Sequence, residues 1–237
     1  MRAAWYERNG PAAEVLTLGE LPDPEPGPGE VRVRLHASGV NPSDVKARAG
    51  TTRKIAFPRV IPCSDGAGVV GHYAVQLAKW AGAEVVATVS SPAKAEHARV
   101  AGADHVIDYR AEDVVKRVRA FTGGVDRIVE VDLGVNLPVS IQILKPFGAI
   151  AAYASAGKPM PELPYQAMMR NNLTVRVVLV YTMPDPAKAQ AAADIARWAR
   201  EWKPRFAIAA RFPLARVVDA HLTVERGEKI GHVVLTA

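Results

Sequence analysis

The residues that follow a strand predicted at 84–89 have the chemistry to bind a phosphate group. Ser90, Ser91 and Lys94 supply two hydroxyl groups and one ammonium group within five positions. Doubly wound nucleotide-binding folds that prefer NAD place an acidic residue here, which binds the ribose 2′-hydroxyl. No carboxylate stands at this point of the sequence, and the hydroxyls and the lysine suit a 2′-phosphate. The pattern therefore predicts an NADP(H) site.

A glycine-rich stretch precedes this strand. Gly66, Gly68 and Gly71 have the G-x-G-x-x-G spacing of a dinucleotide-binding turn, and an amphipathic helix is expected from there to Gly82. That fingerprint needs a strand that runs directly into the first glycine. The residues before it, FPRVIPCSD, contain two prolines, which remove backbone donors and do not suit a central parallel strand. The helix and the next strand fit the motif, whereas the entry into the turn does not.

The elements that must position these residues change in character along the chain. The first 40 residues favour β structure, with an alternating, half-buried strand expected at 31–38 and a proline-rich connector at 22–30. Asn41 then opens a short helix, which Gly50 ends. Further along, strands alternate with helices, and the strands are expected at 84–89, 105–108, 126–131, 149–154 and 174–180. This alternation predicts an α/β fold with a doubly wound, parallel sheet of the Rossmann type, whose strands are covered on both faces.

Composition excludes several classes of protein. The 237 residues are 49% hydrophobic and 23% charged, as in ordinary globular proteins, and no run approaches the length of a membrane span. The single cysteine, Cys63, and the absence of a signal-like start are expected of a cytoplasmic protein. The histidines and Cys63 show no metal-ligand spacing, so no metal site is expected. The net charge of +6 leaves nucleic-acid binding open as a third hypothesis, although no basic run of five occurs.

Four stretches together resemble one known family. They are EPGPGEVRVRLHASGVNPSDVKARAG, FPRVIPCSDGAGVV, GHYAVQLAKWAGAEVVATVSSPAKAEHARVAGADHVIDYR and RFPLARVVDAHLTVERGEKIGHVVL. The chain resembles the zinc-free NADPH:quinone reductase (zeta-crystallin-like) branch of the medium-chain dehydrogenase/reductase superfamily. In that family a block of barrel strands, an inter-domain helix and the first nucleotide-binding strand stand between the parts joined here at Val70 and Gly71. The resemblance therefore implies an internal deletion.

The resemblance also implies a domain division. Residues 1–70 are expected to form a partial GroES-like catalytic domain with a truncated β segment. Residues 71–237 are expected to form a Rossmann-type NADP-binding domain that lacks its first strand and returns to the catalytic domain at its C-terminus. Gly66 and Gly68 match glycines of the barrel, so the G-x-G-x-x-G spacing is a coincidence of the junction.

Six residues are expected to contact the cofactor by this resemblance. Ser90 and Lys94 match the contacts to the 2′-phosphate, Tyr109 a position near the adenosine, and Gly71 the phosphate turn. Asn41 matches an asparagine beside the nicotinamide, and Val131 ends the strand at the edge where open sheets bind ligands. Structural roles remain open for five of them: helix capping for Asn41, packing for Gly71, an interface position for Tyr109, a place beside the N-cap for Ser90 and a surface position for Lys94.

The expected function is that of an NADPH-dependent oxidoreductase that transfers hydride to a small quinone or enone. No catalytic side chain is assigned, because the nicotinamide supplies the hydride and the protein aligns the reactants. A homodimer is one expected assembly. The alternative is a nucleotide-binding remnant with impaired catalysis, since much of the half that covers the nicotinamide is missing.

Overall fold

The computed structural model describes residues 1–52, 54–62, 70–227 and 229–236. The chain divides into two compact units. One contains Met1–Val69 and Phe206–Ala237, and the other contains Val70–Arg205. The chain thus leaves the first unit, builds the second, and returns to the first for its last residues.

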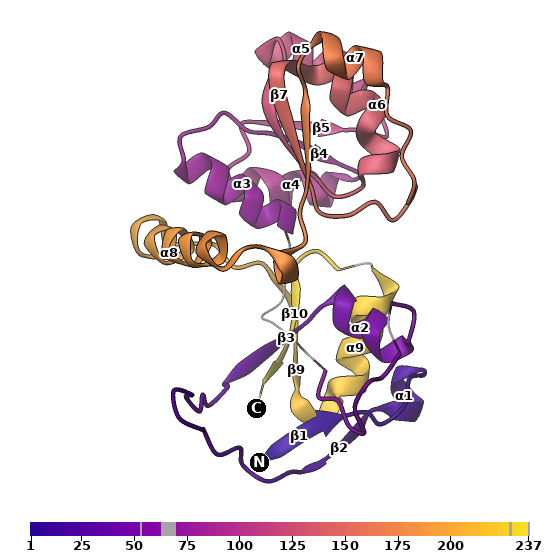
Figure 1. Ribbon diagram of the computed structural model, residues 1–237, viewed down its shortest axis with the longest axis vertical. Coiled ribbons are helices and arrows are strands. Elements are labelled where there is room, and N and C mark those ends of the chain that lie inside the picture. The colour runs from indigo at the N-terminus through magenta and orange to yellow at the C-terminus, as the bar shows by residue number, and fades with distance from the viewer. Residues whose placement is uncertain (53, 63–69, 228, 237) are drawn as a thin grey trace. The chain divides into compact units, whose positions relative to one another are not determined.

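The first unit is built on two small sheets (Figure 1). Strands β1 (Arg2–Trp5) and β2 (Thr17–Glu20) pair antiparallel and are joined through α1 (Ala12–Val15). The second sheet has the order β3-β10-β9, with β3 at Ala37–Val40, β10 at His232–Thr236 and β9 at Ile208–Pro213. Helices α2 (Pro42–Ala49) and α9 (Val217–Arg226) complete the unit, and a short 3-10 turn, η2 (Leu214–Arg216), leads into α9.

One continuous hydrophobic cluster holds this unit together. Its members come from both β3 and β10, from α2 and from α9, so residues far apart in the sequence share one core. Val40, Ala220 and Val233 are fully buried at its centre. Because parts of the unit lie at both ends of the chain, this core forms only when the two ends meet.

The prediction of a strand at 31–38 is wrong for most of these residues. The structure has a strand only from Ala37, and the preceding residues 31–36 are neither strand nor buried. Val31, Val33 and Leu35, the apolar half of the alternating pattern, are all exposed, Val31 by 83%. An alternating sequence forms a strand only where it can pair with a neighbouring strand and bury its apolar side chains in a core. Among the described residues, this segment has neither a partner strand nor a core to pack against.

The second unit alternates helices and parallel strands. In chain order its elements are α3 (Val70–Trp80), β4 (Val86–Val89), α4 (Pro92–Ala101), β5 (His105–Asp108), α5 (Val114–Thr122), β6 (Val125–Glu130), α6 (Leu133–Ile143), β7 (Leu144–Ala152), α7 (Tyr165–Arg170), β8 (Thr174–Val177), η1 (Val180–Thr182) and α8 (Asp185–Trp202). Every strand pairing in this unit is parallel. The predicted α/β class with parallel, Rossmann-type strands is therefore confirmed.

The parallel strands are divided between two sheets. One sheet is the pair β4-β5, and the other has the order β6-β7-β8. In the doubly wound order 3-2-1-4-5-6, the strands that correspond to β4 and β6 would flank strand 1. Among the described residues no strand occupies that place, so the facing edges of β4 and β6 are without a partner strand. Strand β4 is also less covered than expected, because Thr88 is exposed.

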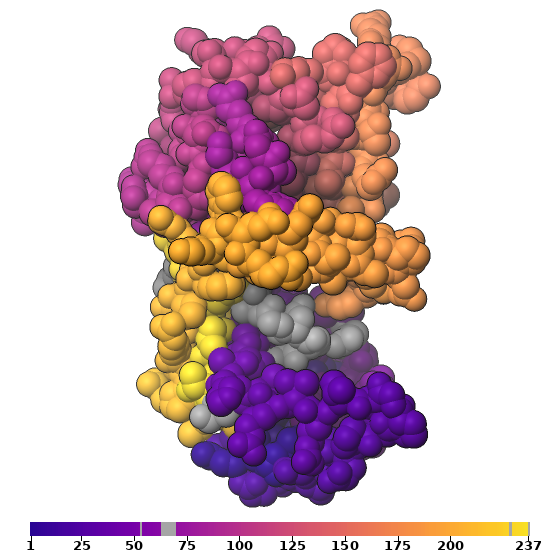
Figure 2. All heavy atoms as spheres, turned by 90° about the vertical axis from the view of Figure 1, so that its left-hand side faces the viewer, coloured from indigo at the N-terminus to yellow at the C-terminus, as the bar shows by residue number. Residues whose placement is uncertain are grey.

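Each of the two sheets has its own hydrophobic cluster. Leu133, Leu137, Leu144, Ile150 and Ala152 pack between α6 and the larger sheet. The smaller sheet is covered by α4 through Val89, Ala95 and Ala98. Helix α8 adds little to either cluster, since Trp198 is its one buried residue. Figure 2 shows one side of this helix, coloured orange, turned toward the viewer.

Candidate functional site

The residues predicted to bind a 2′-phosphate meet at the carboxyl end of β4. Ser90 follows the strand directly and is buried, and Lys94 lies in the first turn of α4. The Lys94 ammonium group donates to the Ser90 hydroxyl at 2.8 Å. Ser91 is the N-cap of α4, where its hydroxyl accepts from the Lys94 amide at 3.4 Å. The local geometry thus places a hydroxyl, a cation and a helix N-terminus at one point.

Tyr109 lies beside this group. Strands β4 and β5 are paired in parallel with Val89 opposite Asp108, and the Tyr109 amide donates to the Val89 carbonyl at 3.0 Å. The tyrosine side chain is 53% exposed. The register therefore brings Ser90, Lys94 and Tyr109 to one edge of the β4-β5 sheet, with the aromatic ring available to solvent.

Gly71 is the second residue of α3, and no atom lies within 4 Å of where its Cβ would be. The position therefore gives no sign of a packing role. Gly66, Gly68 and Cys63 lie outside the described residues, so the structure does not test the predicted turn. Gly71 is the one residue of the expected phosphate turn for which a position is described.

A second polar group lies where β6 ends, and sequence reasoning missed most of it. Glu130 is only 5% exposed and accepts hydrogen bonds from the Asp132 amide and from the Asn136 side chain, both at 2.7 Å. Val131, between them in the chain, is 56% exposed. Burial, and next the charge of Glu130, raise the pKa of Tyr153 at the end of β7. The buried carboxylate thus holds the start of α6 against β6.

The loop after β7 forms hydrogen bonds to the N-terminus of α6. The Gly157 amide donates to the Asp132 carboxylate at 2.9 Å, and the Gly134 amide donates to the Ser155 hydroxyl at 2.9 Å. A Cβ on Gly134 would clash with the Lys158 carbonyl oxygen, so only glycine fits there. Nothing in the sequence near residue 132 indicates this contact, because its partners stand more than 20 positions away.

Asn41 belongs to the first unit, apart from the other five predicted residues. It is buried at the N-terminus of α2, where it forms a capping box with Asp44. The Asn41 amide donates to the Asp44 carboxylate at 2.8 Å. The capping role considered for this asparagine is thus present, and a contact to the nicotinamide stays a prediction.

The residues at the β4-β5 edge fit the adenosine end of NADP(H). A buried hydroxyl already accepts from the lysine, an exposed aromatic ring lies beside it, and no acidic residue stands between Ser90 and Lys94 to repel a phosphate. Toward the pyrophosphate the described residues offer only Gly71 and the start of α3. Among the residues that the structure describes, no three potential metal ligands gather.

A model of the zinc-binding dehydrogenase family matches residues 69–197, more than half of the chain. The chain belongs to this family. Several of the curated proteins that the chain resembles are named quinone oxidoreductases. A quinone oxidoreductase of Pseudomonas aeruginosa is 32% identical over 174 residues, which are 71% of this chain and 54% of that protein. A 2-haloacrylate reductase of a Burkholderia species is 37% identical over 107 residues, 44% of this chain and 32% of that enzyme. The matched part thus spans about half of such a relative or less.

Solved structures of two quinone oxidoreductases have a similar fold. A mycobacterial quinone oxidoreductase superposes with a TM-score of 0.83 at 21% identity and with full coverage of both chains. The quinone oxidoreductase of Thermus thermophilus, described together with its NADPH complex, superposes with a TM-score of 0.77 at 22% identity, again with full coverage of both chains. These likenesses show that the chain shares the fold of these two quinone oxidoreductases. Among the described helices, none is both long and apolar enough to cross a membrane.

Proposed function

We propose that this chain binds NADP(H) at the carboxyl edge of β4 and β5 and acts as an NADPH-dependent oxidoreductase on a small quinone or enone. One observation carries the proposal. The Lys94 ammonium group lies 2.8 Å from the Ser90 hydroxyl, at the point where NAD-specific folds place an acidic residue. A 2′-phosphate would accept hydrogen bonds from both groups, and charge-assisted bonds of this kind are strong.

Further residues support the same orientation of the dinucleotide. Tyr109 offers an exposed ring to the adenosine, and Gly71 leaves the start of α3 accessible to the pyrophosphate. Val131, exposed at the end of β6, and Asn41 in the first unit are the proposed contacts at the nicotinamide end. When bound, the nicotinamide supplies the hydride, so the side chains need only align the reactants and exclude water.

The relatives favour the substrate class. Quinone oxidoreductases and a 2-haloacrylate reductase are among them, and a quinone and an acrylate are both electron-poor alkenes conjugated to a carbonyl group. The resemblance to the zinc-free branch also supports a cytoplasmic location, a protein without zinc and assembly as a homodimer. Metal analysis and sedimentation of the purified protein would test the last two points.

A second candidate is a nucleotide-binding remnant that has lost most of its catalytic power. The division of the parallel strands into β4-β5 and β6-β7-β8 favours it. The proposed adenosine contacts lie on the first sheet and Val131 lies on the second, so a dinucleotide must bridge two sheets that do not pair. Binding could then persist while the alignment needed for hydride transfer is lost.

Two measurements on the same preparation separate these functions. Calorimetric titration with NADPH and NADH tests binding and its preference, and quinone-dependent oxidation of NADPH tests turnover. The oxidoreductase proposal requires both NADPH-preferring binding and turnover. Preferential binding without turnover identifies the remnant, and the absence of any dinucleotide binding would refute both.

A further inference from the structure

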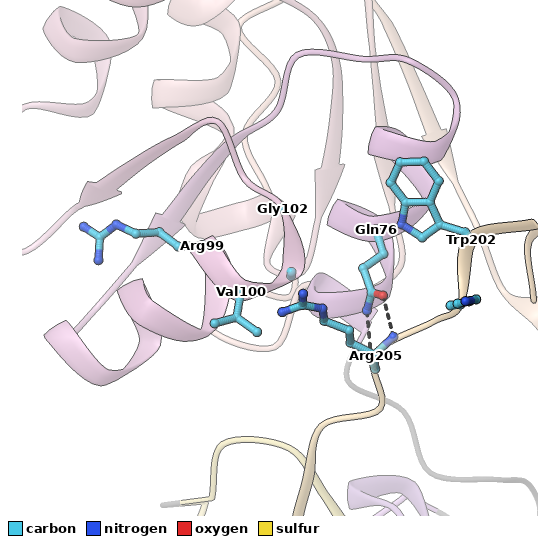
Figure 3. Close-up of a pocket in the computed structure, with 8 residues that line it drawn as sticks. Gln76, Arg99, Val100, Gly102, Trp202 and Arg205 are labelled. Carbon is cyan, nitrogen blue, oxygen red and sulfur yellow. Dashed lines mark hydrogen bonds between the residues drawn. The ribbon is translucent and has the colours of Figure 1, made fainter.

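Two buried side chains of α3 hold the backbone of Arg205, the last residue of the second unit. Gln76 is 2% exposed, and its amide nitrogen donates to the Arg205 carbonyl at 3.0 Å while its amide oxygen accepts from the Arg205 amide at 2.9 Å. The His72 Nε2 atom lies 2.8 Å from the same carbonyl. Figure 3 shows Gln76 reaching the backbone of Arg205. Arg205 therefore makes three hydrogen bonds to side chains of one helix, two through its carbonyl and one through its amide.

The hydrogen bond to the carbonyl decides the tautomer of His72. A carbonyl oxygen only accepts, so Nε2 must carry the proton and a neutral His72 has no proton on Nδ1. That Nδ1 atom is buried, and no described residue bonds to it. The neutral ring is therefore sufficient for the contact to Arg205, and a second proton on it would be buried without an acceptor.

A second histidine stacks on the first. The His97 ring, from α4, lies 4.4 Å from the His72 ring between centroids, with an interplanar angle of 27°. The His97 Nε2 atom is also buried without a partner among the described residues. Two stacked imidazoles are compatible when both are neutral. A charged His97 ring would carry a proton on its buried Nε2 with no described acceptor, and charges on both rings would repel at close range.

The C-terminal end of α8 rests on the same part of α3. Trp198, the buried residue of α8, makes an edge contact to Tyr73 at 6.2 Å between ring centroids. The chain then passes through Lys203, which has a left-handed backbone with φ of 52°, to reach Arg205. Most of α8 is exposed, so this end is where the helix is anchored. Helix α3 thus holds both the end of α8 and the residue at which the chain leaves the unit.

We propose that His72 and His97 form a proton-sensitive latch that releases Arg205 and the C-terminal end of α8 when the pH falls. At neutral pH the His97 ring is uncharged and stacks on His72, while His72 and Gln76 hold the Arg205 backbone. In acid His97 takes up a proton, and opening the latch gives that charge water and distance from the His72 ring. A cavity of about 520 Å³ borders Gln76 and Arg205, so water can reach the latch.

The charges around the two histidines are consistent with a latch that opens as the pH falls. Burial, and next the charge of His72, lower the pKa of His97. The acids of α4 and of the C-terminal half of α8 have partners of their own: Glu96 pairs with Arg99, Asp194 pairs with Arg197, and Glu201 accepts from the Trp80 indole. The remaining groups of the latch, Tyr73, Gln76 and Trp198, are uncharged at these pH values. Because the closed latch binds a proton less tightly than the open one, acid favours the open form.

Amide hydrogen exchange at Arg205 measures the latch directly, since this amide donates to Gln76. After correction for the intrinsic rate, we expect its protection to fall by about tenfold or more between pH 7.5 and pH 5.5, the range in which histidines titrate. Amides in β7 should keep their protection over the same range. Fluorescence of Trp198, in a chain whose other tryptophans are replaced by Phe, should follow the same transition.

Three variants define the outcomes. His97→Phe keeps a stacked ring without a titrating group and should remove the pH dependence at Arg205. His36→Gln changes an exposed histidine and should leave the dependence intact, whereas Gln76→Leu should leave the Arg205 amide unprotected at every pH. Constant protection of the wild-type amide from pH 7.5 to 5.5 would overturn the proposal, as would an unchanged dependence in His97→Phe. If His97→Phe does not fold, ring-proton titration of the wild type decides: ordinary titration of both histidines, with no change at Arg205, refutes the latch.

Discussion

The two units of this protein differ in how far apart in the sequence the residues of each hydrophobic cluster lie. In the first unit, residues from both ends of the chain join in one hydrophobic cluster around Val40, Ala220 and Val233. In the second, residues that are close in sequence form two clusters that belong to two separate sheets. The first unit therefore has one core made from distant pieces, and the second has two cores made from neighbouring pieces.

This difference shows what a central strand contributes to a doubly wound sheet. Each βα segment of the second unit still forms, because its strand pairs with the next one along the chain and its helix packs locally. What is lost is the connection between β4 and β6, the place at which such folds bind their ligand. We therefore expect the missing connection to affect ligand binding and turnover more than the local folding of each segment.

The largest expected effect is on turnover. With the proposed adenosine contacts on one sheet and Val131 on the other, the alignment of nicotinamide and acceptor is not enforced, and alignment and exclusion of water are together worth several kcal/mol of barrier. We expect quinone reduction to be orders of magnitude slower than that of a full-length quinone oxidoreductase assayed in parallel. Comparable turnover, together with a cooperative melt at ordinary temperatures, would show that the site is intact and that the division of the sheet does not matter.

The larger cluster of the second unit should carry most of its stability. Leu137 on α6 is almost fully buried, and Leu137→Ala should lower the free energy of unfolding by about 2–5 kcal/mol through the cavity that it leaves. Val135→Ala, an exposed position on the same helix, should change it by less than about 0.5 kcal/mol. Chemical denaturation measures both, and hydrogen exchange should show the loss in α6 but not in α9. An equal loss of protection in α9 would mean that the two units unfold together.

The core of the first unit contains a group that should make it sensitive to acid. His221 is fully buried on α9, and burial, with a further contribution from the charge of Arg48, lowers its pKa to about 4. The guanidinium group of Arg48 donates to the Gly10 carbonyl and pairs with Glu225. Neither ring nitrogen of His221 has a partner among the described residues. The neutral imidazole is therefore the form that this core accepts.

The direction in which pH changes the stability follows from the difference in proton binding between the folded and the unfolded chain. The unfolded chain binds a proton at His221 below about pH 6.5, and the folded chain does so only near pH 4, so stability is complete above pH 6.5 and is lost as the pH falls between these values. The loss amounts to about 3 kcal/mol. His221→Leu should flatten the stability–pH profile in this range, and His36→Gln should not alter it. A steep profile that survives in His221→Leu would assign the acid sensitivity to other groups.

The sequence predicted best what depends on neighbouring residues. Ser91 caps α4, and Gly50, Gly82 and Gly102 follow their helices with the left-handed backbone that ends a helix, because each of these signals acts within a few positions. Strand pairing depends on distant partners. The alternating residues 31–36 therefore failed to form a strand, and β9 was not predicted at all. The hydrophobic pattern within one segment does not indicate whether a partner strand is present elsewhere in the fold.

The same distinction applies to the candidate site. Ser90 and Lys94 are four positions apart, and their contact could be expected from a strand followed by a capped helix. The contacts of Asp132 and Gly134 could not, since they join the end of β6 to a loop more than 20 residues later. Buried carboxylates such as Glu130 are visible in a sequence only as acidic residues that end an apolar strand, and most acidic residues in that position are on the surface.

The smallest expected effect distinguishes the two sheets as binding surfaces. Lys94→Ala removes the ammonium group beside Ser90 and should weaken NADPH binding by about 1–2 kcal/mol, the scale of one charge-assisted hydrogen bond at an exposed site. NADH lacks the 2′-phosphate, so its affinity should hardly change. Lys116→Ala, at a lysine in α5 outside the proposed contacts, serves as the control and should affect neither cofactor.

Calorimetric titration of each protein with NADPH, NADH and 2′,5′-ADP measures the three affinities under one salt concentration. Because 2′,5′-ADP reaches only the adenosine end, its loss should equal that of NADPH if the β4-β5 edge binds the phosphate by itself. Equal weakening of NADPH and NADH would show instead that Lys94 acts on a part that both cofactors share, and the assignment of the 2′-phosphate to this edge would be wrong.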